Sequence, residues 1–213
     1  MMKYIDLSQK IESGMSYFPG DPEPHINPPD DNQSPWRVSE LHFGTHTGTH
    51  IDAPSHFFPN GRNIDDFEID RFILPGLVAV ALGIQDDQPI HGGLLVASLE
   101  RMPKGGAIVI RTDWSQYWGT SRYGRHPYLT QEAAQAIVEA GASLVGIDAL
   151  NVDSTVKETS HAHQILLGNG IMIVENLSNL SQLEPNLKYQ FSFLPLRLTG
   201  LDGSPIRAVA WSV

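Results

Sequence analysis

Short apolar runs dominate this sequence, and they constrain its fold more than any other feature does. Each run is rich in β-branched and aromatic residues and is bounded by Gly, Pro or Asp, which is the pattern of strands in a sheet. The runs that we interpret as strands are Lys3–Leu7, Trp36–Phe43, Gly76–Leu82, Ala107–Arg111, Ser143–Ile147, Ile171–Val174, Tyr189–Leu198 and Ile206–Trp211. We expect the last two to close the sheet.

Three further segments have the pattern of helices. The clearest is Thr130–Ala140, whose first residue is a candidate N-cap and which Gly141 is expected to end. Leu94–Met102 and His161–Leu167 are the other two. The segment Gly20–Pro35 is rich in Pro, Asp and Asn, so we expect a surface loop there.

The length of the chain favours one folding unit. Its 213 residues suffice for one well-packed domain, and neither a repeat nor a linker divides the sequence. We therefore predict a single domain, residues 1–213, of the α/β class, with a mixed, mainly antiparallel sheet flanked by helices.

The composition excludes several function classes. The formal charge is −10 with only 14 Lys and Arg, and no basic run offers a track for phosphates, so we expect no nucleic-acid partner. The chain has no cysteine, which excludes thiolate ligands, disulfides and a cysteine nucleophile. The N-terminus has no apolar core of a signal peptide, and the apolar stretch Ile73–Ile84 is short and interrupted by Pro75 and Gly76. We therefore expect a cytoplasmic protein that does not span a membrane.

The segment FGTHTGTHIDAPSHF, from Phe43 onwards, places His46, His50, Asp52 and His56 within eleven residues. Imidazole and carboxylate groups bind zinc, manganese and iron, and an open site of this kind lowers the pKa of a bound water towards ~7. The neighbouring residues are Thr, Gly and Pro rather than core side chains. The alternative is a chance cluster of hydrogen-bonded histidines. We interpret the segment as a metal site that serves hydrolysis.

The spacing within this segment leaves two geometries open. The threonines that interleave with Gly48 favour an extended chain, in which positions 46, 48, 50 and 52 share one face. On a straight strand, however, His46 and His50 would lie about 13 Å apart, at ~3.3 Å per residue, which is too far to share one ion. Either the chain bends near Gly48 or the site holds two metal ions.

A second polar group lies about a hundred residues downstream, in SHAHQILLGNGIMIVENL. Glu175 ends an apolar run, where a strand would deliver its carboxylate into a cleft; an exposed strand end is the alternative. His161 and His163 would lie about 200° apart on a helix, so at most one of them points at a shared site. Asp148 and Asp153 would either orient ligand imidazoles or cap turns after a strand.

The run HTGTHIDAPSHF resembles the signature of the cyclase-family metal-dependent hydrolases, which include bacterial kynurenine formamidases and isatin hydrolases. The resemblance extends through YFPGDPEP, VIRTDW, VGIDALNVD, HQILLGNGIMIVENL and DGSPIRAVA, and thus covers essentially the whole chain. It implies a swivelling β/β/α architecture with a barrel-like sheet. It also implies a homodimer or homotetramer and two zinc ions, with manganese as the alternative metal.

The resemblance also assigns roles to residues. The implied metal ligands are His46, His50, Asp52, His163 and Glu175. Asp52 would bridge two ions, and the choice of His163 leaves His161 as a structural residue or a partner of a ligand. His56 would lie outside the metal shell and act as general acid and base, moving a proton between the attacking water and the leaving nitrogen.

The implied reaction is hydrolysis of an amide bond in a small molecule by metal-activated water, with an aryl formamide such as N-formylkynurenine as substrate. Phe18 matches a position that is commonly Trp in formamidases, so it is expected to form an aryl-binding wall. Trp114 is a second candidate, and Asp113 before it would disfavour an anionic substrate if it pointed inward. Further candidates for the pocket wall are Trp36, Tyr117, Trp118 and Arg197.

Two other functions are consistent with the sequence. In the first, the same site opens a cyclic amide or a lactone with a single manganese ion, as the likeness to isatin hydrolases implies. In the second, the chain is a non-catalytic metal- or ligand-binding protein on the same scaffold.

Overall fold

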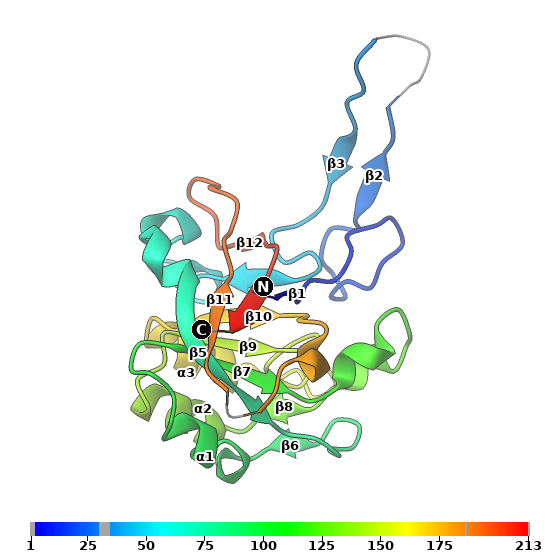
Figure 1. The fold of residues 1–213 in the computed structure, drawn as a ribbon. Helices are drawn as coiled ribbons and strands as arrows, with labels where there is room; N and C mark the ends of the chain where they lie inside the picture. Colours follow the sequence, from blue (N-terminus) through cyan, green and yellow to red (C-terminus); the bar gives the residue numbers. More distant parts are fainter. Residues whose placement is uncertain (1–2, 30–34, 186, 213) are drawn as a thin grey trace.

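The computed structural model describes residues 3–29, 35–185 and 187–212. A curled sheet of nine strands, in the order β1-β13-β11-β5-β7-β9-β10-β4-β12, runs through the molecule (Figure 1). Its strands are β1 (Tyr4–Asp6), β4 (His50–Asp52), β5 (Ile73–Val80), β7 (Ala107–Arg111), β9 (Leu144–Ile147), β10 (Met172–Glu175), β11 (Tyr189–Ser192), β12 (Gly203–Pro205) and β13 (Val209–Ser212). Five neighbouring pairs are antiparallel and three are parallel, which confirms the predicted mixed, mainly antiparallel sheet in an α/β fold.

Two small sheets and several helices surround the main sheet. The small sheets pair β2 (His25–Asn27) with β3 (Glu40–His42) and β6 (Pro89–Ile90) with β8 (Tyr128–Leu129). The α-helices are α1 (Val96–Leu99), α2 (Gln131–Glu139) and α3 (His161–Gly168). The 3₁₀ helices are η1 (Pro54–His56), η2 (Ile64–Asp66), η3 (Ile69–Phe72), η4 (Gly92–Leu94), η5 (Trp114–Tyr117), η6 (Tyr123–Arg125) and η7 (Leu180–Gln182). No helix in the described ranges has both the length and the apolar character needed to cross a membrane.

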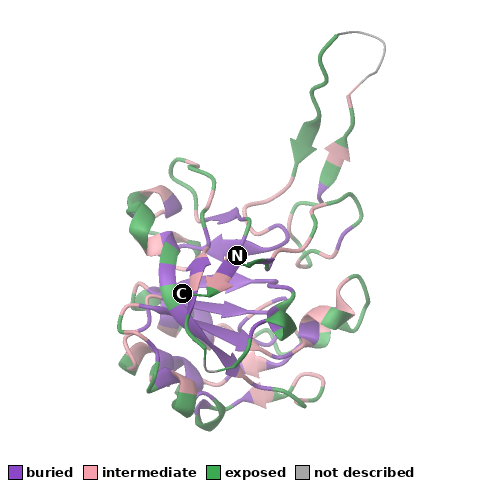
Figure 2. Cartoon of the chain, in the orientation of Figure 1, coloured by how far each residue is buried: buried purple, intermediate pink, exposed green. Residues whose placement is uncertain are grey.

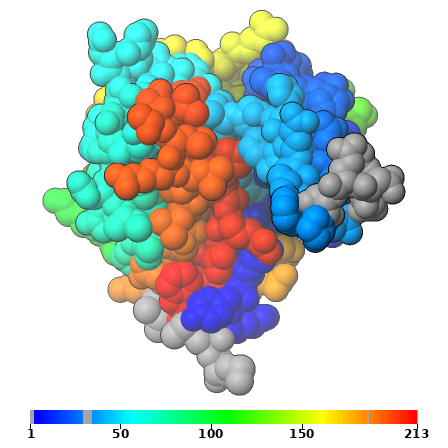
Figure 3. Space-filling model, turned by 90° about the horizontal axis from the view of Figure 1, so that it is seen from above, coloured from blue at the N-terminus to red at the C-terminus, as the bar shows by residue number. Residues whose placement is uncertain are grey.

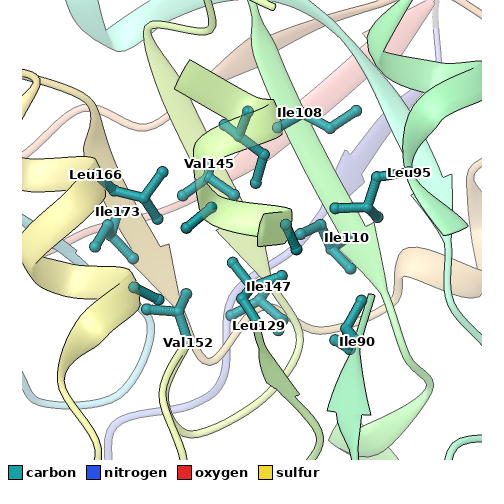
Figure 4. Packing of buried hydrophobic residues seen from close by; sticks show 14 of the residues in the cluster. Ile90, Leu95, Ile108, Ile110, Leu129, Val145, Ile147, Val152, Leu166 and Ile173 are labelled. Atoms are coloured by element: carbon teal, nitrogen blue, oxygen red, sulfur yellow. The ribbon is translucent and has the colours of Figure 1, made fainter. Parts of the chain in front are cut away.

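The three central parallel strands are buried on both faces, which explains why their sequences read as continuous apolar runs (Figure 2). On β7, Ile108 and Ile110 pack on the side of the helices, and Val109 packs on the opposite side. On the helix side, Ile147 and Leu129 lie close together in the same cluster (Figure 4). The sequence therefore located these strands well.

The helix α2 confirms its predicted capping. The side chain of Thr130 accepts a hydrogen bond from the backbone N–H of Ala133 (3.1 Å), and Gly141 follows the helix in a left-handed conformation (φ 73°). The helix α1 is shorter than the expected Leu94–Met102: it begins at Val96, after η4, and ends at Leu99.

Other expectations were wrong at the edges of the fold. The expected loop Gly20–Pro35 contains β2, which pairs with β3 in a hairpin that projects from the body (Figure 1); residues 30–34 lie outside the described part. The run Trp36–Phe43 forms a strand only from Glu40 to His42. The strand predicted for Tyr189–Leu198 ends at Ser192, where the chain approaches Pro195, a residue without a backbone N–H.

Candidate metal centre

The centre lies where β4 passes between β10 and β12. In this antiparallel register, His50 stands opposite Glu175, and Asp52 stands opposite Gly203. Opposite residues on antiparallel strands share a face, as do residues two apart on one strand. The side chains of His50, Asp52 and Glu175 therefore meet on one face of the sheet.

A bend at Gly48 brings His46 to the same place. The strand begins only at His50, so the extended conformation expected from position 46 onwards is wrong, and the alternative of a bend near Gly48 is confirmed. Gly48 has φ 63°, and a Cβ there would lie 3.3 Å from side-chain atoms of Ile11 and Met15. The rings of His46 and His50 consequently lie 5.1 Å apart between centroids.

Five side chains converge on a shared space. The Nδ1 atom of His46 lies 2.7 Å and the Nε2 atom of His50 lies 3.3 Å from Oδ1 of Asp52. The Nε2 atom of His163 lies 3.6 Å from Oδ2 of Asp52 and 3.5 Å from Oε1 of Glu175. Two groups of donors result, one with His46, His50 and Asp52 and one with Asp52, His163 and Glu175. Within each group the donor atoms lie within 4.8 Å of one another, and Asp52 belongs to both.

Hydrogen bonds fix the outward nitrogens of the imidazoles. His50 directs Nδ1 to the carbonyl oxygen of Gly48 (2.8 Å), and His163 directs Nδ1 to a carboxylate oxygen of Asp153 (2.9 Å). Each contact leaves Nε2 facing the other donors, which is how metal-binding imidazoles are held. Asp153 also accepts the backbone N–H groups of Ala162 and His163 at the start of α3. Asp153 thus contacts the ring of His163, as one interpretation of the sequence expected, and caps the start of α3 rather than a turn after a strand.

The charge balance of the centre fits a divalent cation. Burial raises the pKa of the Glu175 carboxyl, and the neighbouring Asp52 raises it further. Burial opposes protonation of His46 and His163, but hydrogen bonds to carboxylates prevail and raise the pKa of each imidazole to about 10, so a bound cation would take the place of one proton on each ring. The Oδ2 atom of Asp52 is buried and has no hydrogen-bond partner. Adjacent buried carboxylates and an unsatisfied oxygen are the features that a bound cation would compensate.

The remaining predicted residues lie around this centre in different ways. His56, on η1, places its ring 4.0 Å from that of His46 and 5.8 Å from that of His163, between centroids. His161 is absent from the described cavity lining: its Nε2 atom donates to the carbonyl of Leu129 (2.8 Å), and its Nδ1 atom lies 3.4 Å from Oδ1 of Asp153, the partner of His163. Asp148 accepts two backbone N–H groups and the hydroxyl of Thr112, so it anchors a turn after β7. Burial raises the pKa of Asp148 to about 6, against the effect of these hydrogen bonds.

A cavity of about 660 Å³ opens above the centre. All five ligand candidates and His56 line it. The other lining residues are Ser16, Tyr17, Phe18, Pro19, Asp21, Gly48, Phe57, Leu150, Asn151, Ser154, Thr155, Glu158, Thr159 and Asn176. Phe18 therefore lies in the wall, as expected, and the ring of Phe57 stacks on that of His163 at 4.7 Å. No Lys or Arg occurs among the described residues of this lining.

Trp114, the second aromatic residue expected in the pocket, lies elsewhere. Its side chain is buried in the core, where the indole N–H donates to the carbonyl of Tyr123 (3.0 Å). Asp113 takes a left-handed conformation (φ 60°) and starts η5, and its carboxylate pairs with Arg111 (2.6 Å) outside the cavity. The condition for repulsion of an anionic substrate by Asp113 is therefore not met. The other candidates Trp36, Tyr117, Trp118 and Arg197 are likewise absent from the described lining.

Two residues of the centre escaped the sequence interpretation. Asp202 lies just before β12, and its Oδ2 atom is 2.9 Å from Nε2 of His46 and 3.2 Å from Nδ1 of His56. These hydrogen bonds hold the pKa of Asp202 well below its usual range. Asn176 has φ 58° and donates from its side chain to the carbonyl of Gly48 (2.9 Å). The only sequence signals for Asp202 and Asn176 were the motifs that contain them, DGSPIRAVA and VENL. Outside such a motif, an Asp-Gly pair indicates only a turn.

Comparison with known proteins places the chain in a family. The Cyclase family model, described as "Putative cyclase", matches residues 5–154. Kynurenine formamidase from Salinibacter ruber is 33% identical over 213 residues, which cover 98% of this chain and 97% of that protein. Kynurenine formamidase from Paracidovorax citrulli is 32% identical, with coverage of 96% and 94%.

Solved structures share the fold. Isatin hydrolase A from Labrenzia aggregata, bound to benzyl benzoate, superposes with a TM-score of 0.88 at 24% identity and covers 99% of this chain and 94% of its own. Isatin hydrolase A from Ralstonia solanacearum gives a TM-score of 0.86 at 24% identity, with coverage of 100% and 92%. At 24% identity, the similarity to these two structures supports only the shared architecture. Membership of the family is shown by the family model and by the formamidases. The chain therefore belongs to the cyclase family, together with these kynurenine formamidases.

Proposed function

We propose that this protein is a metal-dependent amidohydrolase, formed by one domain over residues 1–213, that cleaves the formyl C–N bond of an aryl formamide. The observation that carries the proposal is the pair of donor groups that share Asp52 at the floor of a cavity with aromatic walls. The formamidase relatives, about one-third identical over nearly the whole chain, support the same reaction class.

The proposed ligands divide into two sets. His46, His50 and Asp52 would hold one ion, and Asp52, His163 and Glu175 would hold a second. Zinc is the first choice and manganese the second, because both accept imidazole and carboxylate donors. When bound, such ions polarise a carbonyl oxygen and lower the pKa of water.

The chain's own residues account for orientation and proton transfer. Phe18 and Phe57 would hold the aryl ring, which needs an apolar wall. Water adds to the formyl carbon and gives a proton to His56, the C–N bond breaks, and His56 passes that proton to the leaving nitrogen, so that formate and an aryl amine are released. His56 suits this role because its Nδ1 atom is held by Asp202, which leaves Nε2 for the substrate.

The direct test is hydrolysis of formanilide by purified protein of measured metal content. We expect formate release, loss of activity with a chelator and recovery on adding zinc or manganese. The variant His56→Asn should bind metal normally and lose at least roughly 10²-fold in kcat. Absence of bound metal after supply of both ions would refute the proposal. Unchanged activity of the His56 variant would remove only the proton-transfer step.

A second candidate is the opening of a cyclic amide or lactone. The observation that favours it is the cavity lining, which contains Asp21 and Glu158 but no Lys or Arg among its described residues to pair with a carboxylate-bearing substrate. Isatin and similar neutral rings would avoid that conflict. A parallel screen of aryl formamides, cyclic imides and lactones on the same preparation decides between the two, and preference for the rings would replace the first proposal.

We also propose that the protein forms a homo-oligomer through the β2–β3 hairpin. The hairpin projects from the body and carries exposed Trp36, Val38 and Leu41, with 72%, 72% and 58% of their surface accessible (Figure 1). Exposed apolar groups on a projecting arm are typical of interfaces between subunits. The double substitution Val38→Asp and Leu41→Asp should reduce the mass measured by light scattering, and a monomeric parent protein would contradict the proposal. The cytoplasmic location stays a prediction from the sequence.

A further inference from the structure

The carboxylate of Asp202 contacts both a proposed metal ligand and the proposed proton carrier. Its Oδ2 atom lies 2.9 Å from Nε2 of His46, a proposed metal ligand, and 3.2 Å from Nδ1 of His56, the proposed proton carrier. Its Oδ1 atom accepts the hydroxyl of Thr45 (3.1 Å). One carboxylate therefore contacts three side chains that belong to the segment leading into and out of β4.

The backbone holds this carboxylate in place. The carbonyl of Asp202 accepts the N–H of Ala53 (2.8 Å), and the carbonyl of Leu201 accepts the N–H of Ile64 (2.9 Å). Figure 3 shows the orange and cyan parts of the chain, which these bonds join, side by side. A Cβ at Gly203 would lie 2.7 Å from the carbonyl oxygen of Ile51 and 3.0 Å from the His46 ring. Only glycine at this position lets the ring reach Asp202.

The chemistry of a carboxylate fixes the protons on both rings. An ionised carboxylate only accepts hydrogen bonds, so the ring nitrogens that face it must carry the hydrogens. For His46 this applies to Nε2, which faces Asp202, and also to Nδ1, 2.7 Å from Oδ1 of Asp52, where a bound metal ion would take the place of the hydrogen. For His56 it places a proton on Nδ1 and leaves Nε2 for the reacting groups.

We infer that Asp202 is a positioning residue that orients His46 towards the metal and His56 towards the substrate. The inference rests on the proposed function, since it acts through His46 and His56. A carboxylate that supports one metal-binding imidazole is common, but here the same oxygen also supports the proton carrier. Asp202 couples the two, so its loss affects metal affinity and proton transfer together.

Leaving-group dependence tests the action through His56. Formanilide releases an amine that must be protonated, whereas p-nitrophenyl formate releases a phenolate that needs no proton. For Asp202→Ala we expect kcat for formanilide to fall by roughly 10²-fold, KM to change by less than about 3-fold, and the formate ester to lose less than about 10-fold. At saturating zinc, where the weaker metal binding no longer limits the rate, the double variant Asp202→Ala with His56→Asn should be no slower on formanilide than the single His56 variant.

Metal affinity tests the action through His46 without any turnover. By zinc competition with a chromogenic chelator, Asp202→Ala should bind the ion assigned to His46, His50 and Asp52 roughly 10- to 100-fold less tightly, with an unchanged number of ions per chain at saturation. This measurement remains informative if the parent enzyme hydrolyses no formamide, so failure of the proposed function and failure of this inference are separable.

Asp65 provides the matched control. Its side chain accepts the backbone N–H of Gly200 (2.9 Å) and anchors the same loop from outside the centre. Asp65→Ala should leave both the leaving-group dependence and the zinc affinity as in the parent. If Asp65→Ala reproduces the defects of Asp202→Ala, the carboxylate at 202 only shapes the loop. Equal rate losses on both substrates, additive double-variant losses, or the loss of a whole equivalent of zinc would each overturn the inference, the last because Asp202 would then be a ligand. If Asp202→Ala fails to fold, Asp202→Asn replaces it under the same criteria.

Discussion

At the scale of single residues, Asp52 is where the two donor groups meet. It is buried, it touches three imidazoles, and one of its oxygens lacks a hydrogen-bond partner. Glu175 belongs to only one of the two groups. The geometry therefore separates a shared ligand from a dedicated one, and substitutions at the two positions should have different consequences.

The variant Glu175→Gln should weaken the second ion more than the first. The amide removes a negative charge beside His163 while the other donor group keeps its full set. Zinc titration followed by elemental analysis should give one tightly bound ion per chain in place of two, with a roughly 10-fold or greater loss for the second. The exposed Glu184→Gln is the control. Equal weakening of both ions would show that the ligands are divided differently.

His126 should make stability depend on pH. Burial lowers the pKa of His126 to about 4, against an ordinary value of 6.5, although its contact with the carbonyl of Pro127 opposes the shift. Between pH 4 and pH 6.5, the imidazole of His126 is protonated in the unfolded chain and stays neutral in the folded chain. The stabilisation from the neutral imidazole is therefore complete above pH 6.5 and is lost as the pH falls through 4, by about 3 kcal/mol in total.

Denaturant unfolding of chelator-treated protein, from pH 4 to pH 8, measures this effect. His126→Gln keeps a partner for the hydroxyl of Thr155 and has no titrating group, so its stability curve should be flatter than that of the parent. Parallel curves for the two proteins would mean that His126 protonates in the folded state without cost.

At the scale of elements, the bend at Gly48 positions His46 beside His50. Gly48→Ala should cost about 1–3 kcal/mol in the free energy of unfolding, because φ 63° is strained for alanine and the Cβ crowds Ile11 and Met15. It should also weaken zinc binding, since His46 moves relative to His50. Gly14→Ala, at φ 78° with open space around it, is the control for strain alone and should leave zinc affinity intact. Equal zinc affinity in both variants would show that the bend does not position His46.

The elements that the sequence predicted well are those with strong apolar patterns. The strands β7, β9 and β10 and the helices α2 and α3 lie within one or two residues of their expected bounds. The strand β12 was missed, because it has three residues and contains glycine and proline. The strand β4 is a three-residue part of the extended chain that was expected from position 46. Their pairing depends on neighbours far away in the sequence, which no local pattern encodes.

The sequence likewise predicted some residues of the site and missed others. The five ligand candidates and His56 stand in motifs whose residue types indicate their chemistry, and the structure brings all six together. The position of Trp114 was not predictable, because burial in the core and exposure in a pocket look alike in a local sequence. Asp202 was missed because its partners His46 and His56 lie about 150 residues earlier in the chain.

At the scale of the whole molecule, charge should select substrates. The chain carries a formal charge of −10, and the cavity contains Asp21 and Glu158 but no Lys or Arg among its described residues. Compared with formanilide, 4-carboxyformanilide should show a kcat/KM lower by roughly 10-fold at low salt, and the gap should narrow as salt screens the field. Glu158→Gln should reduce the discrimination, whereas Glu184→Gln should not. A carboxylate substrate that reacts as fast as the neutral one would contradict this prediction.

The position of β4 between β10 and β12 also orders events during synthesis. The hydrogen bond between His46 and Asp202 joins residues that are 156 positions apart, so it cannot form while Asp202 is still inside the ribosome. Contacts this distant along the chain also form slowly. In the emerging polypeptide, the donors of the HTGTHID segment are therefore exposed long before Asp202 can hold His46.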